Sequence, residues 1–131
     1  MHTIIIEGDP VPWKAHQGYG RNSYNPRYKE KQFYQWQIRS QWNRKEPIKG
    51  PVRVHLSFYF VPPKSTSGIR KRQMLNGVLH HIKRPDTSNY VKFVEDCLKT
   101  IIFEDDSQVC YIEAQKLYSE IAKTVIQISE F

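Results

Sequence analysis

Hydrophobic and polar residues alternate in some segments of this chain and follow a helical period in others. Alternation is clearest over 52–61, which reads VRVHLSFYFV, and further runs rich in apolar residues occupy 3–7, 108–117 and 121–128. A period of two is typical of a strand with one buried face. These segments therefore predict four β-strands, with a turn between the last two at 118–120.

Two further segments, 28–42 and 87–100, have apolar residues at helical spacing. Pro85 favours a helix start just after it, and the side chain of Asp86 is of a type that caps helices. The apolar stripe of the second helix comprises Tyr90, Val91, Val94, Cys97, Leu98, Ile101 and Ile102. The order strand, helix, strand, helix, strand, strand predicts one α+β domain over 1–131, with a small mixed β-sheet of about four strands and two main helices.

Two connecting segments are expected to be loops. Residues 14–27 contain two Gly, two Asn and a Pro, which favour irregular structure. Residues 62–85 contain six Lys or Arg and no acidic residue. Because long loops in a compact domain are usually functional or partly disordered, this second segment is a candidate binding element.

Charge is distributed unevenly along the 131 residues, whose net charge is +7. Residues 10–85 contain sixteen Lys or Arg and two acidic residues, whereas 86–131 contain nine acidic residues and four Lys. A basic region with a separate cluster of acidic residues is typical of a metal-dependent enzyme acting on nucleic acid. The alternative is a generally basic protein with a solvated acidic half.

The cysteines and the lengths of the apolar segments bear on the cellular compartment. Cys97 and Cys110 have no metal-ligand spacing, and both are expected to be buried in a reduced protein. The apolar run at 3–6 is too short for a signal peptide, and no run reaches the length of a membrane helix. The sequence thus predicts a cytoplasmic protein without a membrane partner.

The acidic residues around the second predicted helix form the candidate functional site. Asp86 stands at the start of this helix, and Glu104, Asp105 and Asp106 follow its end. We predict that the chain returning after the helix brings Asp86 together with Asp105 or Asp106, beside Lys92. Carboxylates from two elements suit Mg²⁺ and phosphodiester chemistry.

Each of these residues also has a purely structural interpretation. Asp86 can be a helix cap, and the acidic triplet can be a turn. Lys92 can form an ion pair with Asp96, four residues further along the helix. The residue pattern alone leaves these alternatives open.

The sequence PDTSNYVKFVED at 85–96, with EDDSQV at 104–109 and Lys116, resembles the RusA-type Holliday-junction resolvase family. Members of that family carry an Asp-x-Asp-Asn-x-x-Lys helix start and, about one helix later, an Asp-Asp-x-Gln-Val turn before a strand. The resemblance implies a homodimeric endonuclease of bacteria and prophages. It further implies that the protein binds four-way DNA junctions and, with Mg²⁺ or alternatively Mn²⁺, makes paired nicks in recombination and repair.

Carried over by position, Asp86 and Asp106 match the family's first and last catalytic Asp, and Lys92 matches its essential Lys. Asn89 and Asp105 match positions beside the site. The resemblance therefore implies that Asp86, Asp106 and Asp105 are the candidate metal ligands.

Ser88 stands where the family pattern has its second Asp, so one negative charge is lost at this position. A hydroxyl binds cations weakly, and Ser88 is retained among the candidate catalytic residues. The alternative function is a catalytically weak or inactive structure-selective DNA-binding protein.

Basic residues form the candidate DNA-binding surface. Tyrosines interleave with them in 14–31, and aromatic rings beside cations can stack on unpaired bases. The candidate DNA-binding residues are Lys14, Arg21, Arg27, Lys29, Arg70, Lys71, Arg72, Lys83, Arg84 and Asn89. A third interpretation is a basic module for RNA or single strands in which the acidic turn is structural.

Overall fold

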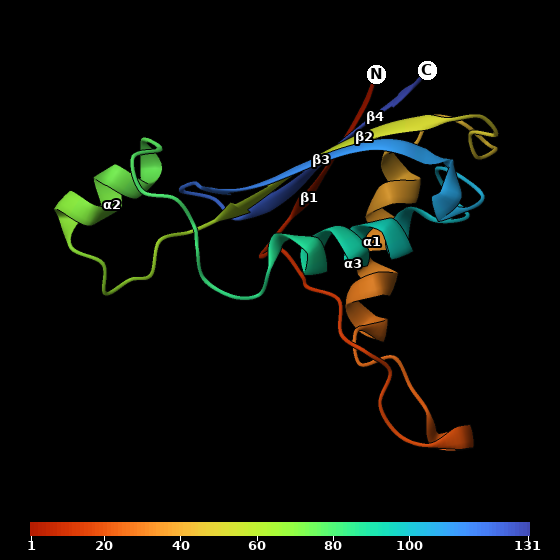
Figure 1. The fold of residues 1–131 in the computed structure, drawn as a ribbon, viewed down its shortest axis with the longest axis horizontal. Coiled ribbons are helices and arrows are strands. Elements are labelled where there is room, and N and C mark those ends of the chain that lie inside the picture. The colour runs from red at the N-terminus through yellow and green to blue at the C-terminus, as the bar shows by residue number, and fades with distance from the viewer.

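A computed structural model describes residues 1–131 and contains a four-stranded mixed sheet with three α-helices (Figure 1). The elements in chain order are β1 (His2–Glu7), η1 (Gly20–Asn22), α1 (Tyr28–Gln41), β2 (Val52–Phe60), α2 (Gly68–Leu75), α3 (Thr87–Leu98), η2 (Asp106–Gln108), β3 (Val109–Tyr118) and β4 (Lys123–Glu130). The predicted α+β class is confirmed. No helix has both the length and the apolar character needed to cross a membrane.

The strands are ordered β1-β4-β2-β3 across the sheet. β4 pairs antiparallel with both β1 and β2, whereas β2 and β3 run parallel. Parallel neighbours require a crossover connection, and α3 lies in the connection between β2 and β3. Phe58 of β2 is opposite Lys116 of β3 on one side and Thr124 of β4 on the other.

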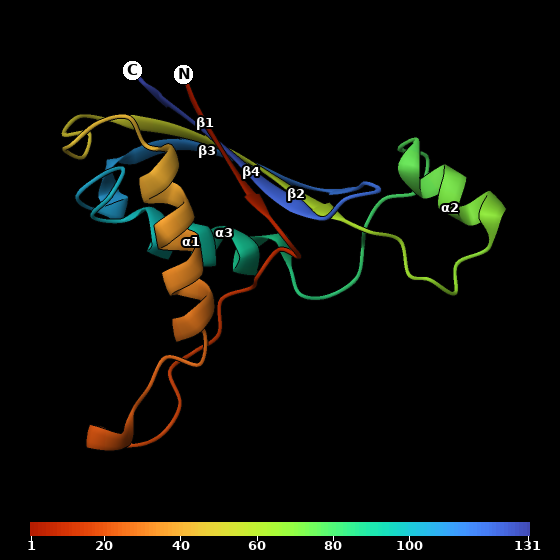
Figure 2. The same cartoon turned by 180° about the vertical axis from the view of Figure 1, so that it is seen from behind.

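Helices α1 and α3 lie on the same face of the sheet, as the two opposite views agree (Figures 1 and 2). One apolar cluster fills the space between these layers. The predicted stripe of α3 is buried in it apart from Val91, which is half-buried. Phe93 is also buried, and its ring packs edge-on against the ring of Tyr34, with the ring centroids 5.0 Å apart. Burial raises the pKa of Cys97 to about 12.

Two expectations from the sequence are wrong. The segment 62–85 is not entirely a loop, because it contains α2. This helix begins at a cap, Ser67, whose hydroxyl oxygen accepts a hydrogen bond from the backbone N–H of Arg70. Cys110 is exposed, since it lies on the edge strand β3.

The two edge strands of the sheet differ in whether their outward backbone groups have hydrogen-bond partners. At the β1 edge, the side-chain amide of Gln41 accepts from the N–H of Ile5 and donates to its carbonyl oxygen, both at 2.9 Å. Gln41 thereby occupies the position of a further strand at this edge. At the other edge, the outward backbone groups of β3 have no hydrogen-bond partner in the chain.

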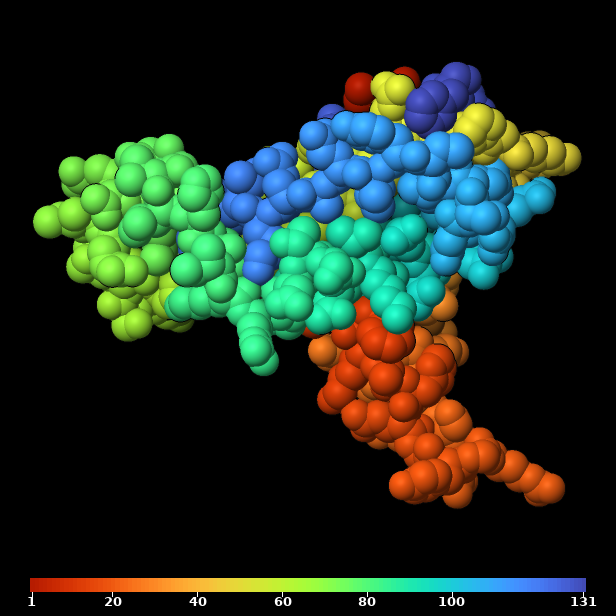
Figure 3. Space-filling view, viewed as in Figure 1, coloured from red at the N-terminus to blue at the C-terminus, as the bar shows by residue number.

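Two projections extend from the body of the molecule (Figure 3). The first is the loop over 14–27, in which Gln17 and Tyr24 form an antiparallel bridge. Gly18 in this loop has a φ of 90°, and an added Cβ would collide with the Asn22 carbonyl oxygen, so a side chain is excluded. The second projection, called the arm here, comprises residues 62–84 and carries α2.

Candidate functional site

Asp86 occupies the N-cap position of α3, but its carboxylate makes no capping hydrogen bond and is exposed. Lys116 lies beside it and donates from Nζ to the carbonyl oxygens of Lys83 at 2.8 Å and Pro85 at 3.1 Å. Burial lowers the pKa of Lys116, and the Asp86 carboxylate opposes this shift. The start of α3 therefore presents an unpaired carboxylate next to a lysine that positions the preceding backbone.

Lys92 is held by an aromatic ring rather than by an acidic residue. Its Nζ atom lies 3.5 Å from the ring centroid of Trp13, and the Trp13 backbone N–H donates to the Asn89 carbonyl oxygen at 2.9 Å. A cation over an indole face is attracted by the ring quadrupole. No ion pair joins Lys92 to Asp96, so the structural alternative proposed for Lys92 is not realised.

Ser88 lies in the first turn of α3 and is exposed. Lys92 follows it by four residues and is exposed as well, so both face solvent on one side of the helix. Asn89 is half-buried, and its backbone N–H donates to the Asp86 carbonyl oxygen at 3.1 Å.

Asp105 is engaged by its own turn. Its Oδ2 atom accepts hydrogen bonds from the backbone N–H and the hydroxyl of Ser107, and its Oδ1 atom lies 3.4 Å from Lys99 Nζ. These hydrogen bonds, followed by the Lys99 charge, hold the pKa of Asp105 below its ordinary value. The Asp106 carboxylate is exposed and has no hydrogen-bond or ion-pair partner, although its backbone carbonyl oxygen accepts from the N–H of Val109.

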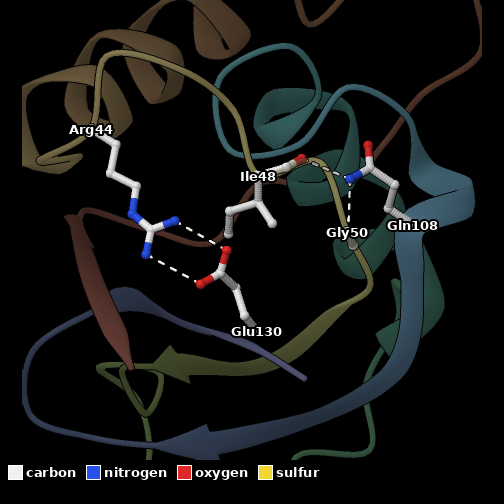
Figure 4. Close-up of polar contacts among 5 residues, drawn as sticks. All are labelled: Arg44, Ile48, Gly50, Gln108 and Glu130. Atoms are coloured by element: carbon white, nitrogen blue, oxygen red, sulfur yellow. Dashed lines mark hydrogen bonds and ion pairs between the residues drawn. The ribbon is translucent and has the colours of Figure 1, made fainter.

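Gln108 anchors this turn to the segment that leads into β2 (Figure 4). Its Oε1 atom accepts from the N–H groups of Glu104 at 2.8 Å and Asp105 at 3.0 Å. Its Nε2 atom donates to the carbonyl oxygens of Ile48 at 2.7 Å and Gly50 at 3.0 Å. The glutamine of the Asp-Asp-x-Gln-Val pattern thus fixes the place of Asp106.

Gln108→Ala is expected to lower the free energy of unfolding by about 1–3 kcal/mol, because it leaves four backbone groups without their partner. Gln108→Glu should be no better, since a carboxylate would face two carbonyl oxygens. Urea denaturation followed by circular dichroism measures the change. Gln115→Ala, which loses a single bond to Ser57 on the neighbouring strand, is the matched control. Equal stabilities of the Gln108→Ala and Gln115→Ala variants would contradict this role.

The acidic residues of one chain form two separate groups. Glu95 has its pKa raised by burial first, and then by the negative charges of Asp106 and Asp96. This group lies where α3 ends and β3 begins, whereas Asp86 lies at the start of α3 (Figure 1). The twelve residues of α3 span about 18 Å.

The predicted convergence of Asp86 with Asp105 or Asp106 in one chain is therefore wrong. Asp106 precedes β3 and lies near the end of α3, and only the later part of β3, at Lys116, reaches the start of the helix. No group of three or more His, Cys, Asp or Glu side chains is arranged to hold a metal ion. The residues of a single chain thus do not fit the divalent metal that the family pattern implies.

The sequence analysis gave no role to three residues around these groups, Glu95, Trp13 and Lys116. Glu95 follows Ser88 and Lys92 by seven and three residues, a spacing that places all three on one helix face and was available as a signal. Trp13 lies far from α3 in sequence, so no spacing could have paired it with Lys92. The contact of Lys116 with the backbone before α3 likewise depends on the sheet register.

Glu95→Gln is expected to stabilise the protein at pH 7 by less than about 1 kcal/mol, since solvent partly screens the charge of this half-buried side chain. A raised carboxyl pKa means that the ionised form is the disfavoured one in the folded state. The advantage of the variant should therefore be present above the folded pKa of Glu95 and fade below the ordinary value of about 4.5. Thermal unfolding at several pH values tests this, with Glu120→Gln as control, and a pH-independent difference would contradict it.

The basic candidates lie mainly on the two projections. Lys14, Arg21 and Lys29 are exposed on or next to the loop over 14–27. Arg27 is half-buried, and its Nε–H donates to the Pro12 carbonyl oxygen at 3.0 Å, which fixes the base of that loop. The exposed basic residues of the arm are Lys64, Arg70, Lys71, Arg72, Lys83 and Arg84. The start of α3 lies between the two projections (Figure 1).

Comparison with known proteins gives a consistent assignment. The profile of the Endodeoxyribonuclease RusA family matches residues 8–129. The chain is also similar to a Bacillus subtilis (strain 168) protein described as "Uncharacterized protein YqaN", with 34% identity over 134 residues that cover 97% of this chain and 94% of that protein. The protein therefore belongs to the RusA endodeoxyribonuclease family.

Proposed function

We propose that this protein is a structure-selective endonuclease that resolves four-way DNA junctions by paired symmetric nicks in recombination and repair. Family membership over nearly the whole chain is the observation that carries the proposal. It is supported by the free carboxylate of Asp86 beside Lys116, at the start of the helix that carries Lys92 and between two basic projections. The proposed active residues are Asp86, Asp106, Lys92 and Ser88, with Asp105 as a residue that shapes the turn.

Divalent metal dependence, with Mg²⁺ or Mn²⁺, is part of this proposal. So are a homodimeric state and a cytoplasmic location in a bacterial or prophage setting. A four-way junction is two-fold symmetric, and a symmetric dimer would offer it two equivalent sites. Asp86 and Asp106 lie apart within one chain, and the proposed site must explain how both carboxylates serve one reaction.

The test is cleavage of a labelled four-way junction with Mg²⁺, Mn²⁺ or EDTA, beside a linear duplex of the same sequence. Symmetric, ligatable nicks that require metal and the junction are the expected result. Cleavage of the duplex at an equal rate would overturn junction selectivity. Equally tight binding of linear single strands would favour a single-strand-binding module instead.

A second candidate function is a junction-binding protein with weak or no cleavage. The presence of Ser88 in place of the family's second Asp favours it, because a neutral hydroxyl attracts a cation less than a carboxylate does. If this candidate is right, the wild type binds the junction tightly without nicking it. Ser88→Asp is then expected to raise the nicking rate at least about tenfold, whereas Ser88→Asn, which adds no charge, should not. Equal rates for the two variants would contradict this explanation.

A further inference from the structure

Two adjoining cavities lie where the arm meets the body of the molecule. The larger, of about 820 Å³, lies against α2 and has Arg70, Lys83 and Tyr118 in its wall. The smaller, of about 260 Å³, reaches Tyr90 of α3, and the two cavities share Pro63, Lys83 and Tyr118. They therefore form one groove, called the arm groove here, which extends from α2 towards the start of α3 (Figure 1).

We propose that the arm groove binds unpaired nucleotides of a DNA strand, next to the bond that is cut. A base lies in the larger cavity against Tyr118, and Arg70 and Lys83 bind the phosphates on either side of this base. Only the position beside the cut bond rests on the proposed function, since the binding of nucleotides requires no cleavage.

The wall of the larger cavity combines apolar and cationic groups and contains no acidic residue. Met74, Leu79 and Tyr118 supply apolar surface, whereas Arg70 and Lys83 supply positive charge. An unpaired nucleotide has the matching parts, because its base stacks on aromatic rings and its phosphate attracts cations. A base inside a duplex is enclosed by its stack and must leave it to enter a cavity. The chemistry of the wall therefore favours an unpaired nucleotide over a duplex.

The walls of the arm groove are held in place by the fold. Tyr118 ends β3, and its ring centroid lies 5.3 Å from that of His81, which stacks on Phe60. The turn after α2 holds Leu79, whose backbone N–H donates to the Gln73 carbonyl oxygen at 3.0 Å. A preformed cavity of this kind loses less conformational freedom on binding than a surface that must first become ordered.

The arm groove ends beside the candidate active carboxylate. Lys83 borders both cavities, and Asp86 follows it by three residues, at most about 10 Å of extended chain. Lys116 fixes this stretch, because its Nζ atom donates to the Lys83 carbonyl oxygen at 2.8 Å. The one acidic residue of the groove, Asp9, borders the smaller cavity alone. A strand that follows the groove therefore comes within reach of Asp86.

Binding of a labelled thymidine hexanucleotide, followed by fluorescence anisotropy in EDTA so that nothing is cut, tests the arm groove. The wild type is expected to bind it, although more weakly than a four-way junction. Tyr118→Ala should weaken binding about tenfold, an effect typical of a base stacked on an aromatic ring. Arg70→Gln should make the slope of log affinity against log salt less negative by about 0.7, the value for one phosphate of a single strand.

Matched substitutions outside the groove serve as controls. Tyr111→Ala removes an exposed ring near the other end of β3, and Arg39→Gln removes an exposed charge from α1. Both variants should bind the hexanucleotide as the wild type does. Tyr118→Phe keeps the ring and should do so too. Because Arg70 is exposed on α2, its replacement tests the groove even if Tyr118→Ala does not fold.

An abasic hexanucleotide separates recognition of the base from attraction of phosphates. It should bind about tenfold more weakly than the thymidine strand, and Tyr118→Ala should weaken its binding no further. The position of the bound nucleotide is tested on a junction with 2-aminopurine beside the nicked bond. This base fluoresces more strongly when it leaves a base stack, so binding of the wild type should change its emission more than binding of Tyr118→Ala does.

The results separate this proposal from the proposed function. Equal binding of the hexanucleotide by the wild type, Arg70→Gln and Tyr118→Ala, or equal affinity for the thymidine and abasic strands, overturns the arm groove as a nucleotide site. An equal change of 2-aminopurine emission with the wild type and Tyr118→Ala overturns the position beside the cut bond. If the wild type nicks no junction, the proposed function fails together with that position, and hexanucleotide binding alone still decides whether the groove takes nucleotides.

Discussion

Replacing Asp86 by Asn is expected to abolish junction nicking while leaving the protein as stable as the wild type. The carboxylate of Asp86 is exposed and makes no capping hydrogen bond, so the stability of the folded state depends little on its charge. Asn is also as good as Asp at a helix N-cap. Under the proposed function the lost charge is needed for the reaction. Loss of nicking by at least about a hundredfold is expected, since even groups that only support metal ligands contribute up to that much.

Three measurements define this result. Nicking of a labelled junction gives the rate, a mobility shift in EDTA gives junction binding, and thermal unfolding gives stability. Glu120→Gln, which removes an exposed carboxylate in the turn between β3 and β4, is the matched control and should leave all three unchanged. An Asp86→Asn protein that nicks junctions at the wild-type rate would remove Asp86 from the active residues.

The second large effect is expected from the arm. Arg70→Gln, Lys71→Gln and Arg72→Gln together remove three exposed positive charges from α2 without a change in helix propensity. If these side chains bind phosphates, the slope of log affinity against log salt should become less negative by about 2.7, or about 0.9 for each phosphate that is no longer neutralised. Junction binding at low salt should weaken as a result. Titrations at several salt concentrations measure both quantities.

A matched triple variant controls for net charge. Arg39→Gln, Lys45→Gln and Lys49→Gln also remove three exposed charges, and they lie towards the end of the sheet where β2 begins rather than where the arm leaves it. The salt slope of this variant should stay close to that of the wild type. Equal changes in the two triple variants would indicate a general effect of net charge and contradict a binding role for the arm.

Hydrophobic periodicity predicted β1, β2, β4 and α3 from the sequence because each buries one face. The alternation over 52–61 corresponds to β2, whose inward residues are nearly inaccessible to solvent. Helix α2 was missed because it projects from the body and buries little, with Met74 as its one buried residue. Such a helix is defined by its cap at Ser67 rather than by an apolar stripe.

The sequence analysis selected the candidate site residues, which stay a prediction, and it did not predict how the structure arranges them. The types and spacing of Asp86, Lys92 and Asp106 are sequence properties, and so is the family resemblance they carry. Whether Asp86 and Asp106 meet depends on the direction in which the chain leaves α3, and no local pattern encodes that direction. The engagement of Asp105 by Ser107 likewise depends on a turn geometry that the composition does not reveal.

The arm joins the body through a narrow base. Phe60, at the end of β2, stacks on His81 near the end of the arm, with ring centroids 4.1 Å apart. The two segments that connect the arm to the body therefore lie side by side. The length of chain between them has little influence on the sheet. Insertions at such points cost little, because loop-closure entropy grows only slowly with length. The arm can therefore change in length or charge while β2, α3 and β3 keep their register, and under the proposed function such a change is expected to alter DNA preference.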